Sequence, residues 1–155
     1  MKRVLLITDG ACIGNPGPGG WACILRYNEH SRELSGGEAA TTNNRMEIKA
    51  AIEGIKRLKE PCEVTVRTDS SYLKDGITLW IHKWKTQGWI HKVKRMGKQP
   101  VKNRDLWEEL DELQTNHKVQ WEWTKGHADD ADNNRCDALA NAAAKRIARE
   151  IPKTR

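Results

Sequence analysis

The sequence has no phenylalanine and no apolar run long enough to cross a membrane. Its few cysteines are scattered and form no CxxC pair: Cys12, Cys23, Cys62 and Cys136. This spacing argues against a zinc site and fits a reducing compartment, so we predict a cytoplasmic protein. The amino terminus, MKRVLLITDG, is interrupted too soon for a signal peptide. Charged residues make up 31% and apolar residues 37% of the chain, which predicts a soluble single domain over residues 1–155 without a membrane partner.

Acidic residues are absent between Gly76 and Arg104, although they are frequent elsewhere. Eight lysines and arginines lie in this segment, more than the net charge of +6 of the whole chain. Basic runs are usually only solvated faces. Here the charges are interleaved with Trp80, Trp84 and Trp89, whose indole rings can stack on bases or sugars while the charges contact phosphates. We therefore predict that this segment binds nucleic acid.

The hydrophobic pattern predicts an α/β fold in one domain. Alternating or apolar runs predict strands over residues 3–8, 21–27, 32–39, 63–68 and 119–124. Helical spacing predicts a helix that carries Ile48 to Leu58 and ends before Pro61, and further helices over 70–87, 100–115 and 131–150. Gly76 is expected to interrupt the second helix and Gly88 to end it. Short connections predict that the first three strands are antiparallel and that the last two add in parallel, giving a five-stranded mixed sheet flanked by helices.

Two aspartates stand where predicted strands end, and each has a structural alternative. Asp9 precedes Gly10 and a run of Gly, Pro and Asn, a pattern typical of a turn. Asp69 precedes Ser70 and could cap the helix that starts there. Either residue alone is better explained as structural.

Glu47 and Asp137 lie on or near the apolar sides of predicted helices. The helical neighbours of Glu47 include Ala51 and Ile55, so its carboxylate lies beside the inward stripe. Its alternative is a capping box formed with Asn44. Asp137 precedes Ala140 and Ala144 on one helix face.

The combination of these acids favours a metal site. A crossover between parallel strands places Asp9 beside Asp69, and Glu47 opens the helix of that crossover. Crowded carboxylates repel one another unless a cation or a proton intervenes. Oxygen ligands without a His or Cys cluster indicate a hard ion such as Mg²⁺ or Mn²⁺. Beside a basic, tryptophan-bearing surface, such a site predicts phosphodiester chemistry.

Five blocks resemble the type 1 ribonuclease H family in that family's order: TDGACIGNPGPGG, TTNNRMEIKAAIEG, TDSSYLKDGITLWIHKWKTQGW, PVKNRDLWEELD and VQWEWTKGHADDADNNRCDALANAAA. The resemblance extends from Val4 to Ala144. It implies a ribonuclease H-like fold and makes four acids the metal-binding and catalytic carboxylates: Asp9, Glu47, Asp69 and Asp137. It also makes His127 an auxiliary catalytic residue and makes Trp80 to Lys98 a basic protrusion of the bacterial type.

The resemblance further implies a reaction. The expected activity is endonucleolytic hydrolysis of the RNA strand of an RNA–DNA hybrid, with two Mg²⁺ ions about 4 Å apart and products that carry 5′-phosphate and 3′-hydroxyl ends. Mn²⁺ is expected to substitute for Mg²⁺. The implied partner is the hybrid duplex, and the protein is expected to be a monomer. The hybrid is expected to be recognised by shape and by 2′-hydroxyl groups.

Substrate contacts are carried over by position. The resemblance implies that 2′-hydroxyls are read by the loop from Cys12 to Asn15, together with Asn43, Asn44 and Glu47. It implies that the DNA strand is contacted by Thr42, Trp80, Trp84 and Asn103, and we add Ser71, Lys85 and Trp89 as substrate-binding residues. Ser71 replaces a glutamine that is frequent in the family, and the insertion HKVKRMGKQ lengthens the basic segment.

Two other classes share some of these features. A DNA-cutting nuclease of the resolvase or transposase type would share the sheet and the acids but would lack the TTNNRME block. A non-catalytic hybrid-binding module would keep the basic segment without needing clustered carboxylates. Cleavage of plain duplex DNA, or binding without cleavage in Mg²⁺, would identify them.

Overall fold

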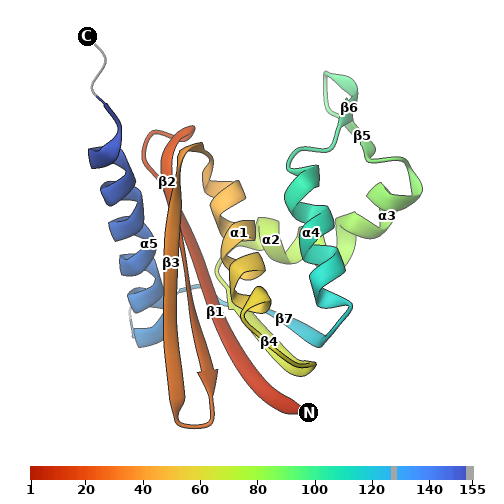
Figure 1. The fold of residues 1–155 in the computed structure, drawn as a ribbon. Helices are drawn as coiled ribbons and strands as arrows, with labels where there is room; N and C mark the ends of the chain where they lie inside the picture. Colours follow the sequence, from red (N-terminus) through yellow and green to blue (C-terminus); the bar gives the residue numbers. More distant parts are fainter. Residues whose placement is uncertain (127–128, 153–155) are drawn as a thin grey trace.

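The computed structural model describes residues 1–126 and 129–152, and a five-stranded sheet is its centre (Figure 1). The strand order is β3-β2-β1-β4-β7. The strands are β1 (Lys2–Cys12), β2 (Gly17–Tyr27), β3 (His30–Thr41), β4 (Cys62–Thr68) and β7 (Lys118–Trp123). β2 is antiparallel to β1 and to β3, whereas β4 is parallel to β1 and to β7. The predicted mixed sheet is therefore confirmed.

Helices cover the two faces of this sheet unequally. Helices α1 (Asn43–Lys56) and α4 (Arg104–Gln114) lie on one side, and α5 (Ala131–Glu150) packs across β1, β2 and β3 on the other (Figure 1). Alternate strand residues serve the two faces: Leu6 and Val66 join the core beneath α1, whereas Ile7 packs with Cys136 beneath α5. Within the described ranges, no helix is both long and apolar enough to span a membrane.

The β1–β2 connection differs from the prediction. β1 continues beyond Asp9 to Cys12, and the glycine-rich segment that follows the turn already belongs to β2, where Gly20 pairs with Ala11. A Cβ atom on Gly20 would lie 2.2 Å from the carbonyl oxygen of Ala140. Glycine is thus placed here by the close approach of α5 to the sheet, and the prediction that Asp9 ends its strand is wrong.

The predicted second helix is a continuous helical segment of three parts: α2 (Ser71–Asp75), the π-helical η1 (Gly76–Trp80) and α3 (Ile81–Thr86). α2 ends with Gly76 as its C-cap and the π-helical η1 begins there, so the predicted interruption is a change of helix type within a segment that stays helical. A Cβ atom there would lie 2.2 Å from the Trp107 ring, so the absence of a side chain lets this segment pack on α4. Gly88, with φ of 66°, follows the end of α3 as predicted.

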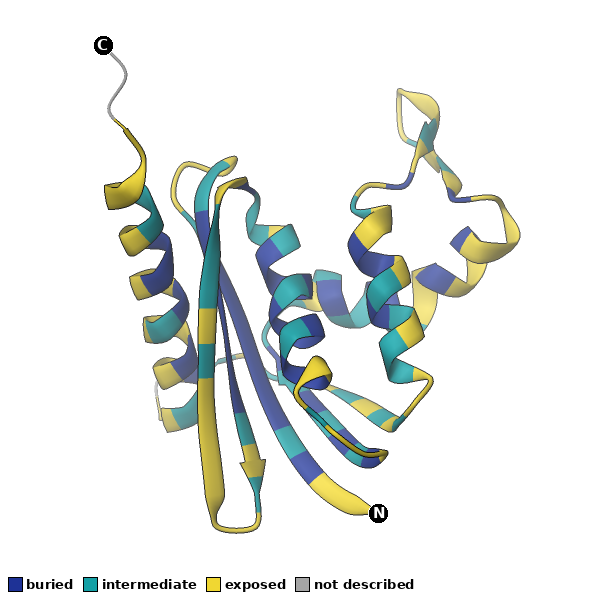
Figure 2. Cartoon of the chain, viewed as in Figure 1, coloured by how far each residue is buried: buried dark blue, intermediate teal, exposed yellow. Residues whose placement is uncertain are grey.

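The basic segment contains a hairpin that the pattern did not predict. Strands β5 (Ile90–Val93) and β6 (Gly97–Pro100) pair antiparallel and form an arm that stands away from the sheet (Figure 1). The arm is largely exposed (Figure 2). Because Pro100 belongs to β6 and Asn103 has a φ of 65°, α4 begins at Arg104 rather than at the predicted residue 100.

Candidate active site

Three carboxylates converge beside the junction of β1 and β4. One ligand oxygen from each of Asp9, Glu47 and Asp69 lies within 4.8 Å of the other two. Asp9 belongs to β1, Asp69 follows the last residue of β4, and Glu47 comes from α1. The parallel pairing of Thr8 with Thr68 places the two aspartates side by side. The predicted convergence of these three acids is therefore observed.

Glu47 does not cap its helix. The N-cap of α1 is Thr42, whose hydroxyl accepts a hydrogen bond from the main-chain N–H of Arg45 at 3.2 Å. Glu47 therefore lies more than one turn inside the helix, and only 4% of it is exposed. The capping-box alternative with Asn44 is wrong, and the carboxylate is buried without that structural role.

Gly10 brings α1 close to Asp9. Its main-chain N–H donates to Oδ1 of Asp9 at 2.8 Å, and a Cβ atom at this position would lie 2.6 Å from the main-chain nitrogen of Glu47. The sequence pattern favoured Asp-Gly as turn chemistry, but this glycine lies inside β1. Its function is to let helix and strand approach until their carboxylates meet.

Asp69 is likewise free of a capping role. The N-cap of α2 is Ser70, whose hydroxyl accepts from the N–H of Leu73 at 3.0 Å. The main chain of Asp69 is held from β7, because Nε1 of Trp123 donates to its carbonyl oxygen at 3.1 Å. Trp123 was not among the predicted site residues, and its place at the end of β7 is the sequence signal that indicates it.

Burial sets the protonation of this cluster. Burial first, and the charge of Asp69 second, raise the pKa of Asp9 to about 7. Burial and the neighbouring Asp9 raise the pKa of Glu47 well above its ordinary value, and burial and Asp137 raise that of Asp69. Among the described residues, Oδ2 of Asp9 and Oε2 of Glu47 are buried and have no hydrogen-bond partner. Buried oxygens left in this state are typical of a site that a cation completes.

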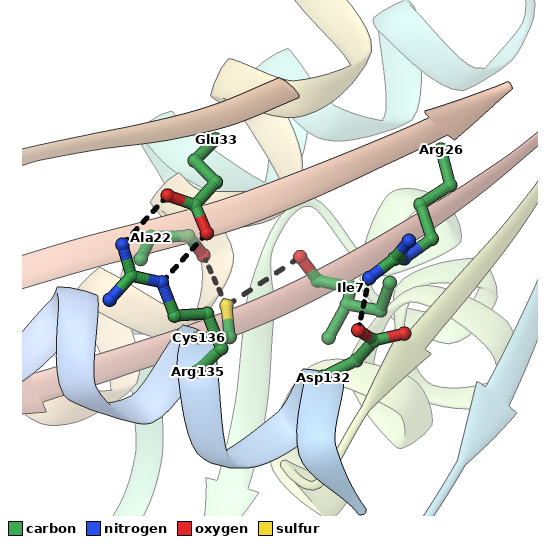
Figure 3. Close-up of polar contacts among 7 residues, drawn as sticks. All are labelled: Ile7, Ala22, Arg26, Glu33, Asp132, Arg135 and Cys136. Carbon is green, nitrogen blue, oxygen red and sulfur yellow. Dashed lines mark hydrogen bonds and ion pairs between the residues drawn. The ribbon is translucent and has the colours of Figure 1, made fainter. Parts of the chain in front are cut away.

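Asp137 lies on α5, outside the group of three. It is exposed, and its negative charge raises the pKa of Asp69 and of Asp9, which places it near both. The preceding residue, Cys136, anchors this turn: its thiol lies 3.2 Å from the carbonyl oxygen of Ala22 (Figure 3). The position of Asp137 is thus set by the packing of α5 on the sheet.

Ion pairs on both sides of Cys136 hold the same turns (Figure 3). Arg135 contacts both carboxylate oxygens of Glu33 at 2.7 and 2.9 Å, and Arg26 pairs with Asp132. These contacts join α5 to β3 and β2. They orient the helix turn that carries the fourth predicted acid.

His127, the predicted auxiliary catalytic residue, lies outside the described residues. Gly126, the last described residue before it, lies beside Asp69 of the carboxylate cluster. Gly126 has a φ of 66°, and a Cβ atom there would lie 3.5 Å from Oδ2 of Asp69 and 2.8 Å from Nδ2 of Asn133. The assignment of His127 remains a prediction.

Residues predicted to read 2′-hydroxyls lie at the end of β1, in the β1–β2 turn and at the start of α1. The side-chain oxygen of Asn15 accepts from the N–H of Asn43 at 2.9 Å, which ties the β1–β2 turn to the start of α1. The thiol of Cys12 lies 3.5 Å from the carbonyl oxygen of Thr41. Asn44 is exposed on the first turn of α1. The structure therefore brings these residues together on one surface.

Residues predicted to contact the DNA strand differ in exposure. Trp80 is 40% exposed, whereas Trp84 and Trp89 are 7% and 9% exposed and meet in a tilted ring contact within the main hydrophobic core. Lys85 pairs with Asp111 at 2.9 Å. Because Trp84 and Trp89 are buried, they stabilise the substrate-facing surface from beneath and contribute little exposed area to it.

Ser71 and Asn103 frame the helices on this side. Ser71 is the exposed first residue of α2, and Asn103 immediately precedes α4. Side-chain contacts of Asn103 reach α1 and α2, to Arg45 and to Tyr72. Ser71 and Asn103 thus lie at the starts of α2 and α4.

Comparisons with known proteins agree with this geometry. The family model for RNase H matches residues 1–145. A ribonuclease H from Solibacter usitatus is 59% identical over 145 residues, covering 94% of this chain and 97% of its own. A ribonuclease H from Erythrobacter litoralis is 57% identical over 144 residues, covering 93% and 97%. The crystal structure of LC9-RNase H1, a type 1 RNase H with the type 2 active-site motif, superposes with a TM-score of 0.81 at 32% identity, covering 94% of this chain and 74% of that one.

Proposed function

The chain belongs to the ribonuclease H family, and we propose that Asp9, Glu47, Asp69 and Asp137 form the metal site with which it degrades the RNA strand of RNA–DNA hybrids. The activity is that of an endonuclease, and the enzyme is a hydrolase that uses a divalent metal. The proposal assigns the roles of individual residues, the identity and number of the ions, and the manner of substrate binding.

One observation carries the assignment of the site. Asp9 and Glu47 hold buried carboxylate oxygens that have no hydrogen-bond partner in the described part of the chain, and both lie within 4.8 Å of an oxygen of Asp69. Burial of such groups is unfavourable unless they are protonated or bind a cation. A purely structural cluster would satisfy these oxygens with donors.

Oxygen ligands of this kind suit Mg²⁺, and Mn²⁺ would be accepted by the same donors. We propose two ions per site, held by Asp9, Glu47 and Asp69 on the buried side and by Asp9 and Asp137 on the exposed side. When bound, such a pair supplies an activated water and stabilises the leaving 3′ oxygen of an in-line displacement.

The protein's own residues supply order and access. The Gly10 N–H fixes one oxygen of Asp9, so that the other points toward the shared centre. Glu47 is 4% exposed and closes the floor of the site to bulk water. Asp137 is exposed, which leaves its side of the site open to a phosphodiester.

The substrate is proposed to lie across the starts of α1 and α2. The Asn15–Asn43 contact and Asn44 present polar groups to 2′-hydroxyls, which only the RNA strand carries. The DNA strand is proposed to follow Trp80, Asn103 and the basic arm, whose charges suit phosphates. We propose a single domain, because the ribonuclease H family model matches residues 1–145, and we propose that the protein acts as a monomer. His127 is proposed to assist proton transfer or product release.

The test uses end-labelled RNA–DNA hybrid, duplex DNA and duplex RNA, each with Mg²⁺ and with EDTA. Of the three substrates, we expect only the hybrid to be cleaved, and only with Mg²⁺ present. The products should carry 5′-phosphate and 3′-hydroxyl ends. Cleavage of duplex DNA would assign the chain to a DNA nuclease, and hybrid binding without cleavage would identify a binding module.

A further inference from the structure

Asn103 is held by contacts from two other helices. Nη1 of Arg45, on α1, donates to Oδ1 of Asn103 at 3.2 Å, and Nδ2 of Asn103 donates to the hydroxyl of Tyr72, on α2, at 3.0 Å. Both contacts are partly buried. They link the residue before α4 to the helix that carries Glu47 and to the helix that follows Asp69.

These contacts determine which way the amide of Asn103 faces. A guanidinium can only donate, so the oxygen of the amide must face Arg45 and the NH₂ group must face away. One N–H of that group is directed to Tyr72. The second N–H has no hydrogen-bond partner among the described residues, so an acceptor such as a phosphate oxygen can use it. Without Arg45, the amide could rotate and present its oxygen, which would repel a phosphate.

Arg45 is itself held firmly. Its guanidinium forms a two-pronged contact with Asp105, with Nη1–Oδ1 and Nη2–Oδ2 distances of 3.0 and 2.8 Å. The hydrogen bond from Arg45 lowers the pKa of Asp105, and the same contact raises the pKa of Arg45. A planar fork can serve Asp105 and Asn103 together, whereas a lysine ammonium has no such geometry.

The backbone at Asn103 supports the same interpretation. Asparagine is a preferred N-cap residue, yet Asn103 stands at the N-cap of α4 without a side-chain capping bond. Its φ of 65° is uncommon for a residue with a side chain. The residue thus gives up its usual local bond, and its side chain is directed to Arg45 and Tyr72.

The network ends at an exposed aromatic ring. The ring of Tyr72 lies 5.9 Å from that of Trp80 in an edge-on contact, and Trp80 is 40% exposed. Asn103 and Trp80, two of the residues proposed to contact the DNA strand, are therefore joined through Tyr72. We propose that Arg45, clamped by Asp105, is a positioning residue that sets the amide of Asn103 for a DNA phosphate. This inference rests on the proposed function.

The test is a double-mutant cycle between Arg45→Lys and Asn103→Ala, with steady-state cleavage of hybrid and fluorescence anisotropy of hybrid binding in EDTA. Each single variant should raise KM about 3- to 10-fold, because that is the loss of affinity expected when one hydrogen bond is removed. The kcat should stay within about twofold of wild type. On the Asn103→Ala background, Arg45→Lys should change KM by less than about twofold, because both act through one amide. Arg3→Lys is the matched control, since Arg3 pairs with Glu63 at the far end of β1.

Two further measurements separate positioning from folding. Asp105→Asn removes the carboxylate that holds the Arg45 guanidinium, and it should therefore raise KM as Arg45→Lys does. In the free protein, the side-chain NH₂ resonances of Asn103 should shift in Arg45→Lys and stay unchanged in Arg3→Lys. If Arg45→Lys lowers only thermal stability, or if its effect on KM is fully additive with Asn103→Ala, the positioning role is wrong. Failure of the wild-type protein to bind or cleave hybrid would instead overturn the proposed function, and this inference with it.

Discussion

The main-chain nitrogen of Glu47 lies 2.6 Å from the place that a Cβ atom would take on Gly10. Real Cβ atoms do not approach a backbone nitrogen so closely, so strand β1 and helix α1 can meet here only because residue 10 has no side chain. The same contact decides how near the carboxylates of Asp9 and Glu47 lie to each other.

Gly10→Ala should therefore damage both stability and the site. Overpacking against α1 should destabilise the fold by about 1 to 3 kcal/mol and should weaken stabilisation by Mg²⁺, because Glu47 is pushed from Asp9. Urea melts with and without Mg²⁺ measure both effects. Gly97→Ala is the control, because a Cβ atom there meets nothing within 4 Å, although φ is 73°. Equal Mg²⁺ stabilisation of Gly10→Ala and wild type would contradict the prediction.

Asp9→Asn should abolish hybrid cleavage while leaving hybrid binding within about threefold of wild type. In Asp9, the Gly10 N–H holds Oδ1, whereas the buried Oδ2 has no hydrogen-bond partner among the described residues and can bind a cation. The proposed substrate contacts are made by other residues. Single-turnover cleavage and anisotropy in EDTA separate the two effects. Glu29→Gln, on the exposed β2–β3 turn, makes the same chemical change away from the site. Cleavage near the wild-type rate in Mg²⁺ would remove Asp9 from the mechanism.

The metal-free protein should lose stability as the pH rises from about 4 to 7. Burial raises the pKa of Asp9 from 3.8 to about 7, so in this window the folded state binds a proton that the unfolded state has released. The slope from this group approaches about 1.4 kcal/mol per pH unit at most, with the stabilisation present at low pH and lost as the pH passes the folded pKa. Urea melts in EDTA across this range should show the slope, and Asp9→Asn should reduce it. A stability that rises over the same window would show that the cluster is satisfied by donors.

Replacing Lys92, Lys94, Arg95 and Lys98 together with alanine should weaken hybrid binding and flatten its salt dependence. Lys92 and Lys98 are direct partners across the β5–β6 hairpin, and like charges held opposite each other are unfavourable without an anion. Loss of up to four phosphate contacts should reduce the slope of log affinity against log salt by up to about 4.

The control for this variant removes an equal charge from the opposite end of the sheet, by alanine at Lys2, Arg3, Lys59 and Lys118. These residues lie at or before the first residues of β1, β4 and β7, away from the carboxylates. An unchanged salt slope in the hairpin variant, or an equal change in the control, would show that the arm is only a solvated face.

Local sequence preferences failed where helices press on the sheet. The segment around Gly20 contains the residues of a turn, yet it is a strand, because α5 leaves no room for a side chain there. Gly76 does interrupt α2 as predicted, but the close contact with the Trp107 ring on α4, which leaves no room for a side chain there, was not predicted. Contacts with residues far along the chain decide both cases, and no local pattern contains them.

The sequence by itself determined the mixed sheet, antiparallel in its first three strands and parallel in its last two, and the meeting of Asp9 with Asp69. Alternation and helix spacing specify the elements, and chain connectivity limits how parallel strands can be joined. Only the tertiary structure decided that Glu47 is buried rather than a cap, that Trp84 and Trp89 are covered, and that Arg45 faces Asn103. Each of these depends on the distance at which two elements pack. That distance is set by residues such as Gly10, which has no side chain, and Trp107, which has a large one, and both touch residues that no sequence period relates to them.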